Sequence, residues 1–192
     1  GAKPARVVVI PNGIVVDDRD SRTGASLAPA ATPDVYRIAT VGRLAPEKDL
    51  GTLLRAFAIA RQSLNALLWV VGEGPELESL RKLADKLGIG DSVEFVGFNS
   101  DPFSVVRSAD VFVHTALFEG FGNVILEAMA SGVPVIATDC DFGPREIIRH
   151  GENGLLAVAA DADRLAAEIV ALCNDAGMRS RLVSAGYDTV KH

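Results

Sequence analysis

The stretch "DVFVHTALFEGFGNVILEAMASGVPVIATD", residues 110–139, predicts a strand, a glycine-containing loop, a helix and a second strand, in that order. The runs "DVFVHTA" and "VPVIATD" are apolar at consecutive positions, as in strands that are buried on both faces. Between them, "NVILEAMASG" predicts a helix that is closed by Gly132. Two such strands joined by a helix form a parallel pair, so this stretch indicates an α/β fold.

The rest of the chain repeats this alternation. Five further apolar runs are candidate strands: "RVVVIP", "YRIATVG", "ALLWVVG", "VEFVG" and "GLLAV". Most of them are apolar at consecutive positions, which requires helices on both sides of the sheet. We therefore expect a single domain over residues 1–192, with a Rossmann-like, doubly wound parallel sheet and helices on both faces. Ligand sites in such sheets lie beyond the carboxyl ends of the strands.

Two segments with helical spacing flank these strands. The apolar residues of 50–64 recur as on one face of a helix, with arginines on the other face. A second helix is expected to be capped by Asp161 and to end around Gly177. Residues 17–33 are polar and lack periodicity, which predicts a surface loop.

Composition and charge argue against several classes of protein. The 192 residues carry a formal net charge of -6 and no basic stripe, so nucleic acid is not an expected partner. The longest apolar runs are too short to cross a bilayer. Cys140 and Cys173 lie far apart without metal-binding spacing, which indicates reduced thiols and a cytoplasmic location.

The loop "VGRLAPEKD", residues 41–49, places two cations at one strand end. Gly42 ends the strand, and a short proline-containing turn separates Arg43 from Lys48. A guanidinium can hold phosphate oxygens in a fork and an ammonium adds a point charge, so the pair suits a pyrophosphate. The alternative is that both side chains are solvated surface residues. Their position at a strand end favours the phosphate site.

A second loop, "GEGPE" at residues 72–76, carries a weaker signal. Gly72 and Gly74 would let the backbone pass close to a ligand, and Pro75 suits the first residue of a helix. The third glycine of a dinucleotide-binding fingerprint is replaced by Leu77. A plain turn between strand and helix explains this loop equally well.

Glu119 and Glu127 lie eight positions apart, on either side of a glycine turn. Gly120 and Gly122 would expose backbone N–H groups at the start of a helix, where anionic oxygens or hydroxyls can bind. The Glu127 carboxylate, about one turn inside the helix, can lean back towards the same place. Because carboxylates accept from diols and amides donate to oxyanions, the ligand predicted is a sugar nucleotide. The alternative is that both glutamates are ordinary surface charges.

Together these motifs resemble the C-terminal, donor-binding half of a retaining GT-B glycosyltransferase of family 4. The resemblance covers about residues 7–156 and includes "IPNGI", "VGRLAPEKD", "GEGPE", "VEFVGF", the E-x7-E pair and "GPREI". It implies three catalytic residues, with the donor diphosphate held by Arg43 and Lys48 and the transferred sugar bound by Glu119. Glu127 would bind the ribose hydroxyls. The residues implied to bind the donor are Gly42, Gly72, Gly97, Phe98, His114, Gly120, Phe121, Gly122, Asn123, Val124 and Glu127.

Within this set, the resemblance places the amides of 120–123 at the sugar and phosphates, and Gly97 and Phe98 near the base. His114 ends an apolar strand, where a satisfied core histidine is the alternative to a donor contact. Asn123 departs from the family pattern, which more often has an apolar residue after the glycine turn.

The resemblance also implies how the reaction proceeds. The donor phosphate is described as taking the acceptor proton in this family, so no protein base is expected on this half, and neither a cofactor nor a metal is implied. Of three D-x-D strings, only Asp139/Asp141 lies at a strand end and is worth testing for metal. The nucleotide-diphosphate sugar is the expected partner.

An N-terminal acceptor-binding domain is expected to be absent from this chain, and any peripheral membrane contact would come through that missing half. Two other functions stay open. A sugar-nucleotide epimerase or phosphorylase-like relative would share the fold but should show a base or a cofactor lysine, which the sequence lacks. A non-catalytic nucleotide-binding module would bind the same ligand without transferring the sugar.

Overall fold

The computed structural model describes residues 34–191, so the candidate strand at 6–11 and the loop at 17–33 lie outside the described residues. Six parallel strands form one sheet in the order β3-β2-β1-β4-β5-β6. They are β1 (Tyr36–Val41), β2 (Ala66–Val71), β3 (Val93–Gly97), β4 (Val111–His114), β5 (Val135–Asp139) and β6 (Leu155–Val158). The predicted doubly wound parallel sheet is confirmed, and every run predicted within the described range forms a strand.

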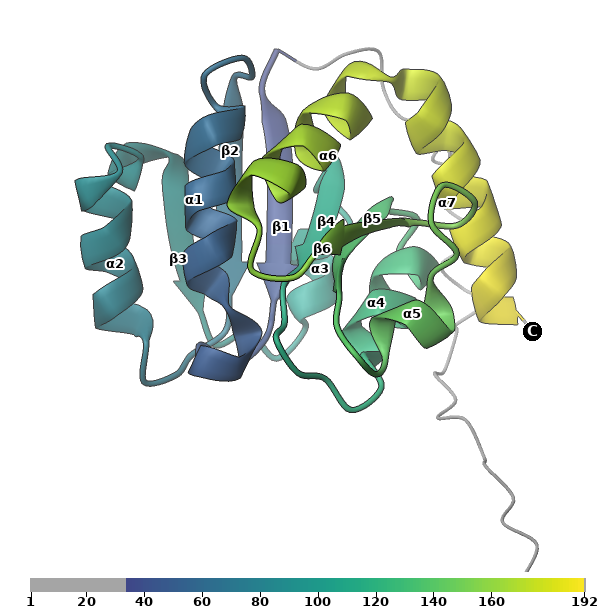
Figure 1. The fold of residues 1–192 in the computed structure, drawn as a ribbon, viewed down its shortest axis with the longest axis horizontal. Helices are drawn as coiled ribbons and strands as arrows, with labels where there is room; N and C mark the ends of the chain where they lie inside the picture. Colours follow the sequence, from purple (N-terminus) through teal and green to yellow (C-terminus); the bar gives the residue numbers. More distant parts are fainter. Residues whose placement is uncertain (1–33, 192) are drawn as a thin grey trace, which may run out of the picture.

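Helices cover both faces of this sheet (Figure 1). One layer contains α1 (Leu50–Ala60), α2 (Leu77–Lys86) and α6 (Ala162–Asn174). The other contains α3 (Pro102–Val106), α4 (Asn123–Ala130) and α5 (Pro144–Ile147), with α7 (Ala176–Lys191) packed on α4. Two short 3-10 turns, Pro46–Lys48 and Gly90–Ser92, precede α1 and β3.

The consecutive apolar residues of the strands are explained by these two layers. Ile38 belongs to the core cluster beneath α1 and α6, whereas its neighbour Ala39 belongs to the cluster beneath α4. Both side chains are fully buried, because successive residues of a strand point to opposite faces. Phe57 of α1 fills the first cluster. No helix among residues 34–191 has the length and apolar character needed to cross a membrane.

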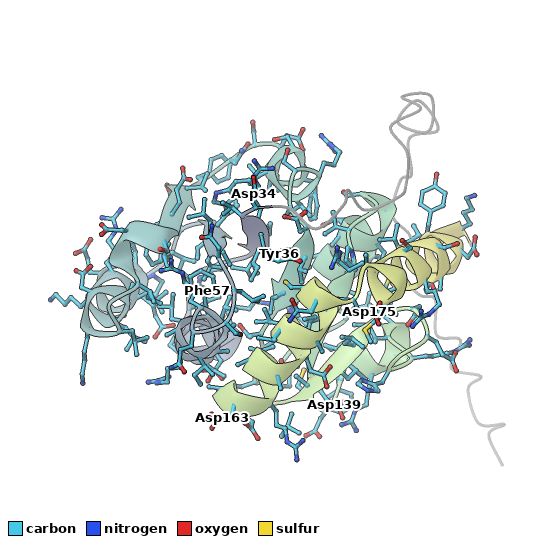
Figure 2. The ribbon with its side chains drawn as sticks, turned by 90° about the horizontal axis from the view of Figure 1, so that it is seen from above. Asp34, Tyr36, Phe57, Asp139, Asp163 and Asp175 are labelled. Carbon is cyan, nitrogen blue, oxygen red and sulfur yellow. The ribbon has the colours of Figure 1, made fainter. Side chains whose placement is uncertain are left out.

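The helix expected from Asp161 to about Gly177 is in fact two helices. The Asp161 cap is confirmed, since its carboxylate accepts from the N–H of Arg164 at 2.9 Å. The predicted end is wrong, because α6 stops at Asn174 and Gly177 lies inside α7. Asp175 makes the break: its backbone is extended, and its carboxylate accepts from the N–H of Met178 at 2.8 Å. Figure 2 shows Asp175 at this junction.

Two other predicted boundaries also shift. The helix expected over 50–64 ends at Ala60, and Leu64 is buried in the turn that follows. The helix after "GEGPE" begins at Leu77, so Pro75 lies in the turn before it.

The corner between α6 and α7 is built around Arg179, which is 1% exposed. Its Nη1 donates to the carbonyls of Leu172, at 2.9 Å, and of Cys173, so it satisfies two of the last carbonyls of α6. The guanidinium lies 5.7 Å from the ring centroid of Tyr36, whose hydroxyl donates to the Cys173 carbonyl at 2.6 Å. This corner fixes the amino end of β1 to the helical layer.

Candidate functional site

The candidate site lies where the direction of strand order reverses. β1 pairs with β2 on one side and with β4 on the other, so the loops that leave β1 and β4 diverge to opposite faces of the sheet (Figure 1). In doubly wound sheets a crevice opens at this point, beyond the carboxyl ends of the strands. Three predicted residues, Arg43, Lys48 and Glu119, belong to these two loops.

Main-chain and hydroxyl contacts hold the two loops together. Leu117 donates its N–H to the carbonyl of Glu47 at 2.9 Å, and the Thr115 hydroxyl donates to the carbonyl of Lys48 at 2.8 Å. These bonds place the Lys48 side chain beside the loop that follows β4. The loops after β1 and β4 therefore touch at this edge of the sheet before the chain continues to opposite faces.

At the centre of this arrangement is the carboxylate of Glu119, whose side chain is 17% exposed. Lys48 Nζ forms an ion pair with Glu119 Oε2, and His114 Nε2 lies 3.0 Å from the same oxygen. The N–H of Gly120 donates to Glu119 Oε1 at 3.2 Å. Glu119 thus has donors on both carboxylate oxygens.

These donors keep Glu119 ionised. The hydrogen bond from His114, with a further contribution from Lys48, outweighs the effect of burial and lowers the pKa of Glu119 to about 2. An ionised carboxylate only accepts hydrogen bonds, so His114 must carry a proton on Nε2. His114 is itself 2% exposed at the end of β4, which makes it a satisfied histidine at the edge of the site.

Arg43 differs from Lys48 in its environment. Its side chain is exposed and makes neither an ion pair nor a hydrogen bond within residues 34–191. A small pocket opens between β1 and β4, and it brings together four of the predicted residues: Gly42, Arg43, Lys48 and His114. The other lining residues are Thr40, Val41, Leu44, Leu50, Val70, Val71 and Thr115.

The glycines of "GEGPE" have a role that the sequence did not predict. A Cβ at Gly72 would lie 2.0 Å from the carbonyl oxygen of Gly42, and one at Gly74 would lie 2.2 Å from that of Leu44. The backbone that passes close to these glycines is therefore the chain's own loop after β1. Leu44 also donates to the carbonyl of Glu73 at 2.9 Å, which joins the two loops through their main chains.

The start of α4 presents backbone N–H groups that have no acceptor among the described residues. Gly122 has φ +89, in the left-handed region that favours glycine, and it ends the loop immediately before the helix. The N–H groups of Asn123 and Val124 donate to no acceptor in the described part of the chain. The N–H of Gly120 is instead occupied by Glu119.

Glu127 lies on α4 and is half-buried. Its carboxylate makes no hydrogen bond or ion pair with any described residue, and burial raises its pKa. A half-buried carboxylate without a partner is a suitable acceptor for ligand hydroxyls. The pocket between β1 and β4 does not extend to Glu127.

Gly97 and Phe98 lie at the end of β3, on the far side of β2 from the pocket. Gly97 accepts from the N–H of Gly72 at 2.9 Å, and Phe98 is 76% exposed. Neither residue, nor Gly72, lines the pocket with Arg43. Phe121 is half-buried in the loop before α4.

Two residues that shape the site were missed at the level of sequence. The Thr138 hydroxyl accepts from the N–H of Ala116 and donates to its carbonyl, both at 2.8 Å. Gly143 has φ +83, and a Cβ there would lie 2.8 Å from the carbonyl oxygen of Phe121. A threonine in the apolar run "VPVIATD" and a glycine in "DFGPRE" were the available signals.

Asp139 and Asp141, the pair worth testing for metal, do not belong to a cluster of metal-binding side chains. Asp139 accepts from Arg145 Nε at 2.9 Å, and the site has no third ligand beside it. No group of three or more His, Cys, Asp or Glu side chains in the described range is placed to hold a metal ion. Both cysteines are free and buried.

Comparison with known proteins gives the family of this chain. Residues 28–189 match the family described as Glycosyl transferases group 1. The chain belongs to this family. Among curated proteins, this group 1 domain is 37% identical over 162 residues to the lipopolysaccharide core biosynthesis glycosyltransferase LpsE of Rhizobium meliloti, covering 84% of this chain and 46% of LpsE. It is 35% identical to the phosphatidyl-myo-inositol mannosyltransferase of Mycobacterium leprae, covering 96% of this chain and 49% of that protein. The chain thus spans about half the length of these relatives.

Solved structures of other proteins have a similar fold. The C-terminal domain of the group 1 protein LpcC from Francisella tularensis superposes with a TM-score of 0.74 at 31% identity, covering 81% of this chain and 84% of that domain. HepE of Anabaena in complex with UDP superposes with a TM-score of 0.76 at 28% identity, covering 82% of this chain and 44% of HepE. The predicted architecture, one half of a GT-B fold, is confirmed by these neighbours.

Proposed function

We propose that this chain is the donor-binding half of a retaining, family 4 glycosyltransferase that takes a sugar from a nucleotide-diphosphate sugar. The observation that carries the proposal is the cluster at the reversal of strand order, where Lys48, His114 and Glu119 meet beside an unpaired Arg43. The acceptor is a glycan, a lipid-linked sugar or a small molecule. The names of the relatives, which refer to lipopolysaccharide core and phosphatidyl-myo-inositol, support a role in polysaccharide or glycolipid synthesis.

The residues have distinct roles in this proposal. Arg43 and Lys48 hold the diphosphate and stabilise the negative charge that develops on it as the sugar leaves. Glu119 accepts hydrogen bonds from the transferred sugar, and Glu127 accepts them from the ribose. The free amides at the start of α4 donate to phosphate or sugar oxygens. The binding of UDP by HepE supports a nucleotide site on this fold.

Protonation fits these roles. Glu119 is ionised at neutral pH, so it can accept from sugar hydroxyls but cannot donate a proton to a leaving group. A carboxylate with a lowered pKa is also a weak base, so we propose that the donor's own phosphate takes the acceptor proton. Transfer also requires a second domain to supply the acceptor site, and we expect this chain alone to bind the donor without transferring its sugar.

Calorimetric titration with UDP-, GDP- and ADP-sugars tests the donor site. We expect one of these ligands to bind, and Arg43→Ala to weaken it by about tenfold or more, because charge-assisted hydrogen bonds to phosphate are lost. Arg164→Ala is the matched control, since Arg164 is an exposed arginine on α6. Binding that is unaffected by Arg43→Ala, or absent for all three nucleotides, would overturn the proposal.

A second measurement tests catalysis and stereochemistry. The chain is joined to an N-terminal acceptor domain from a full-length relative, and the anomeric configuration of the product is read by NMR. A product with the donor's configuration is expected. An inverted product would contradict retention, and binding without transfer in this enzyme would favour a non-catalytic module.

A further inference from the structure

The two cations of the site are held differently. Arg43 is exposed and has no partner in the described chain, whereas Lys48 is 20% exposed and forms an ion pair with Glu119. Any ligand that uses both cations on its phosphates must therefore draw Lys48 towards itself. Arg43 can bind a phosphate without breaking any existing ion pair.

Glu119 limits which ligands can draw Lys48 onto their phosphates. Its Oε2 accepts from both Lys48 and His114, and its Oε1 accepts from the N–H of Gly120. If Lys48 turns to a phosphate, a mostly buried, ionised carboxylate loses one of its donors. Leaving such a charge short of donors is unfavourable. A diphosphate brings only acceptors, but a sugar brings hydroxyl donors that can replace Lys48.

We propose that the Lys48–Glu119 ion pair lets the site discriminate the intact nucleotide sugar from the nucleoside diphosphate. This inference rests on the proposed function. With the intact donor, the phosphates share Lys48 while a sugar hydroxyl donates to Glu119. After transfer the nucleoside diphosphate offers no hydroxyl at that position, so the ion pair forms again and favours release of the product.

His114 is a positioning residue in this scheme. Its Nε2–H stays on Glu119 Oε2 whether or not Lys48 is present, because the ring is buried at the end of β4. The carboxylate therefore keeps its orientation when Lys48 turns to the phosphates. The loop after β4 is further fixed by Thr138, which bonds both the N–H and the carbonyl of Ala116.

The decisive variant is Glu119→Gln, which keeps the shape and the acceptor for His114 but removes the charge that holds Lys48. Affinities of a nucleotide sugar and of its nucleoside diphosphate are measured by calorimetry for the wild type and the variant. The nucleoside diphosphate is expected to bind about fivefold tighter to the variant, the equivalent of one partly buried ion pair. The nucleotide sugar is expected to gain no affinity. Thermal unfolding of the variant confirms that it is folded at the temperature of the titration.

Glu119→Gln could bind the nucleoside diphosphate more tightly for two reasons: Lys48 is released, or a carboxylate that repels the phosphates is lost. A double-mutant cycle distinguishes them. In the Lys48→Met background, Glu119→Gln should leave the affinity for the nucleoside diphosphate unchanged; an equal gain with and without Lys48 would overturn the inference. Glu47→Gln is the matched control, because it removes an exposed carboxylate next to Lys48 that forms no ion pair among the described residues. It should not tighten binding of the nucleoside diphosphate.

The outcomes also distinguish this inference from the proposed function. If the wild type binds a nucleotide sugar through Arg43 but Glu119→Gln weakens both ligands equally, the donor site stands and the discrimination is refuted. If no nucleotide binds at all, the proposed function fails, and the inference fails with it. Inorganic pyrophosphate, which needs neither base nor sugar, serves as a further probe: Glu119→Gln should bind it more tightly than the wild type does.

Discussion

Acid is expected to destabilise the fold through Glu119. The pKa of this carboxyl falls from an ordinary 4.5 to about 2 on folding, chiefly because of the hydrogen bond from His114. A group with a lowered pKa favours folding above its unfolded pKa and loses that contribution as the pH falls towards the folded value. The lowering corresponds to about 3 kcal/mol at neutral pH, of which about 2 kcal/mol is lost by about pH 3.

Urea unfolding of the wild type and of Glu119→Gln measures this contribution. The free energy of unfolding is determined for both proteins at several pH values between about 6 and about 3, and the difference between them is plotted against pH. Other carboxylates titrate equally in both proteins and largely cancel. The advantage of the wild type should shrink by about 2 kcal/mol across this range. A difference that does not change with pH would refute the ionised, hydrogen-bonded state of Glu119.

Glu127→Gln provides a control of opposite sign. Burial raises the pKa of Glu127 without a compensating partner, so the folded chain binds its proton more tightly than the unfolded chain does. Its contribution to stability therefore improves as the pH falls towards and through its ordinary value. As the pH falls from about 6 to about 3, the free energy of unfolding of the wild type should rise relative to that of Glu127→Gln. Relative to that of Glu119→Gln it should fall.

Two further predictions concern the scaffold. Arg179→Met should lower the free energy of unfolding by about 3 kcal/mol, because two carbonyls at the end of α6 lose a charged donor. The control is Arg181→Met, which replaces an exposed arginine on the same helix. Equal urea midpoints for the two variants would contradict the role of Arg179. Gly72→Ala should cost more than about 3 kcal/mol, because its Cβ would overlap the Gly42 carbonyl at 2.0 Å. Gly120→Ala, where a Cβ would meet nothing within 4 Å, should change the melting temperature little, and equal losses in both variants would exclude the clash as the cause.

The sheet was predictable because its physical cause is local. A strand that is covered on both faces needs apolar residues at consecutive positions, and most of the six described strands show this pattern. The strand β3 departs from it, since Glu94 is exposed. The end of α6 was not predictable in the same way. Asp175 both breaks one helix and caps the next, and neither proline nor a terminal glycine marks the position.

The candidate site was predictable in its location but less so in its contacts. Residues at the carboxyl ends of parallel strands meet at one edge, which is why Lys48 and Glu119 were both predicted to belong to one donor site. Their pairing joins residues 71 positions apart, and it depends on the path of both loops. The same holds for Thr138 and Ala116, which lie 22 positions apart. Only the folded chain shows that Gly72 and Gly74 accommodate the protein's own backbone.

The contact between the loops after β1 and β2 has a consequence for motion. Leu44 donates to the carbonyl of Glu73 at 2.9 Å and accepts from the N–H of Glu76 at 3.0 Å, while the glycines bring the two main chains into direct contact. Neither loop can swing outward alone without breaking these bonds. We therefore infer that the segment that carries Arg43 and Lys48 is a rigid part of the scaffold. In the proposed donor site its cations would reach a ligand by rotation of their side chains, which for an exposed side chain such as Arg43 takes about a nanosecond or less.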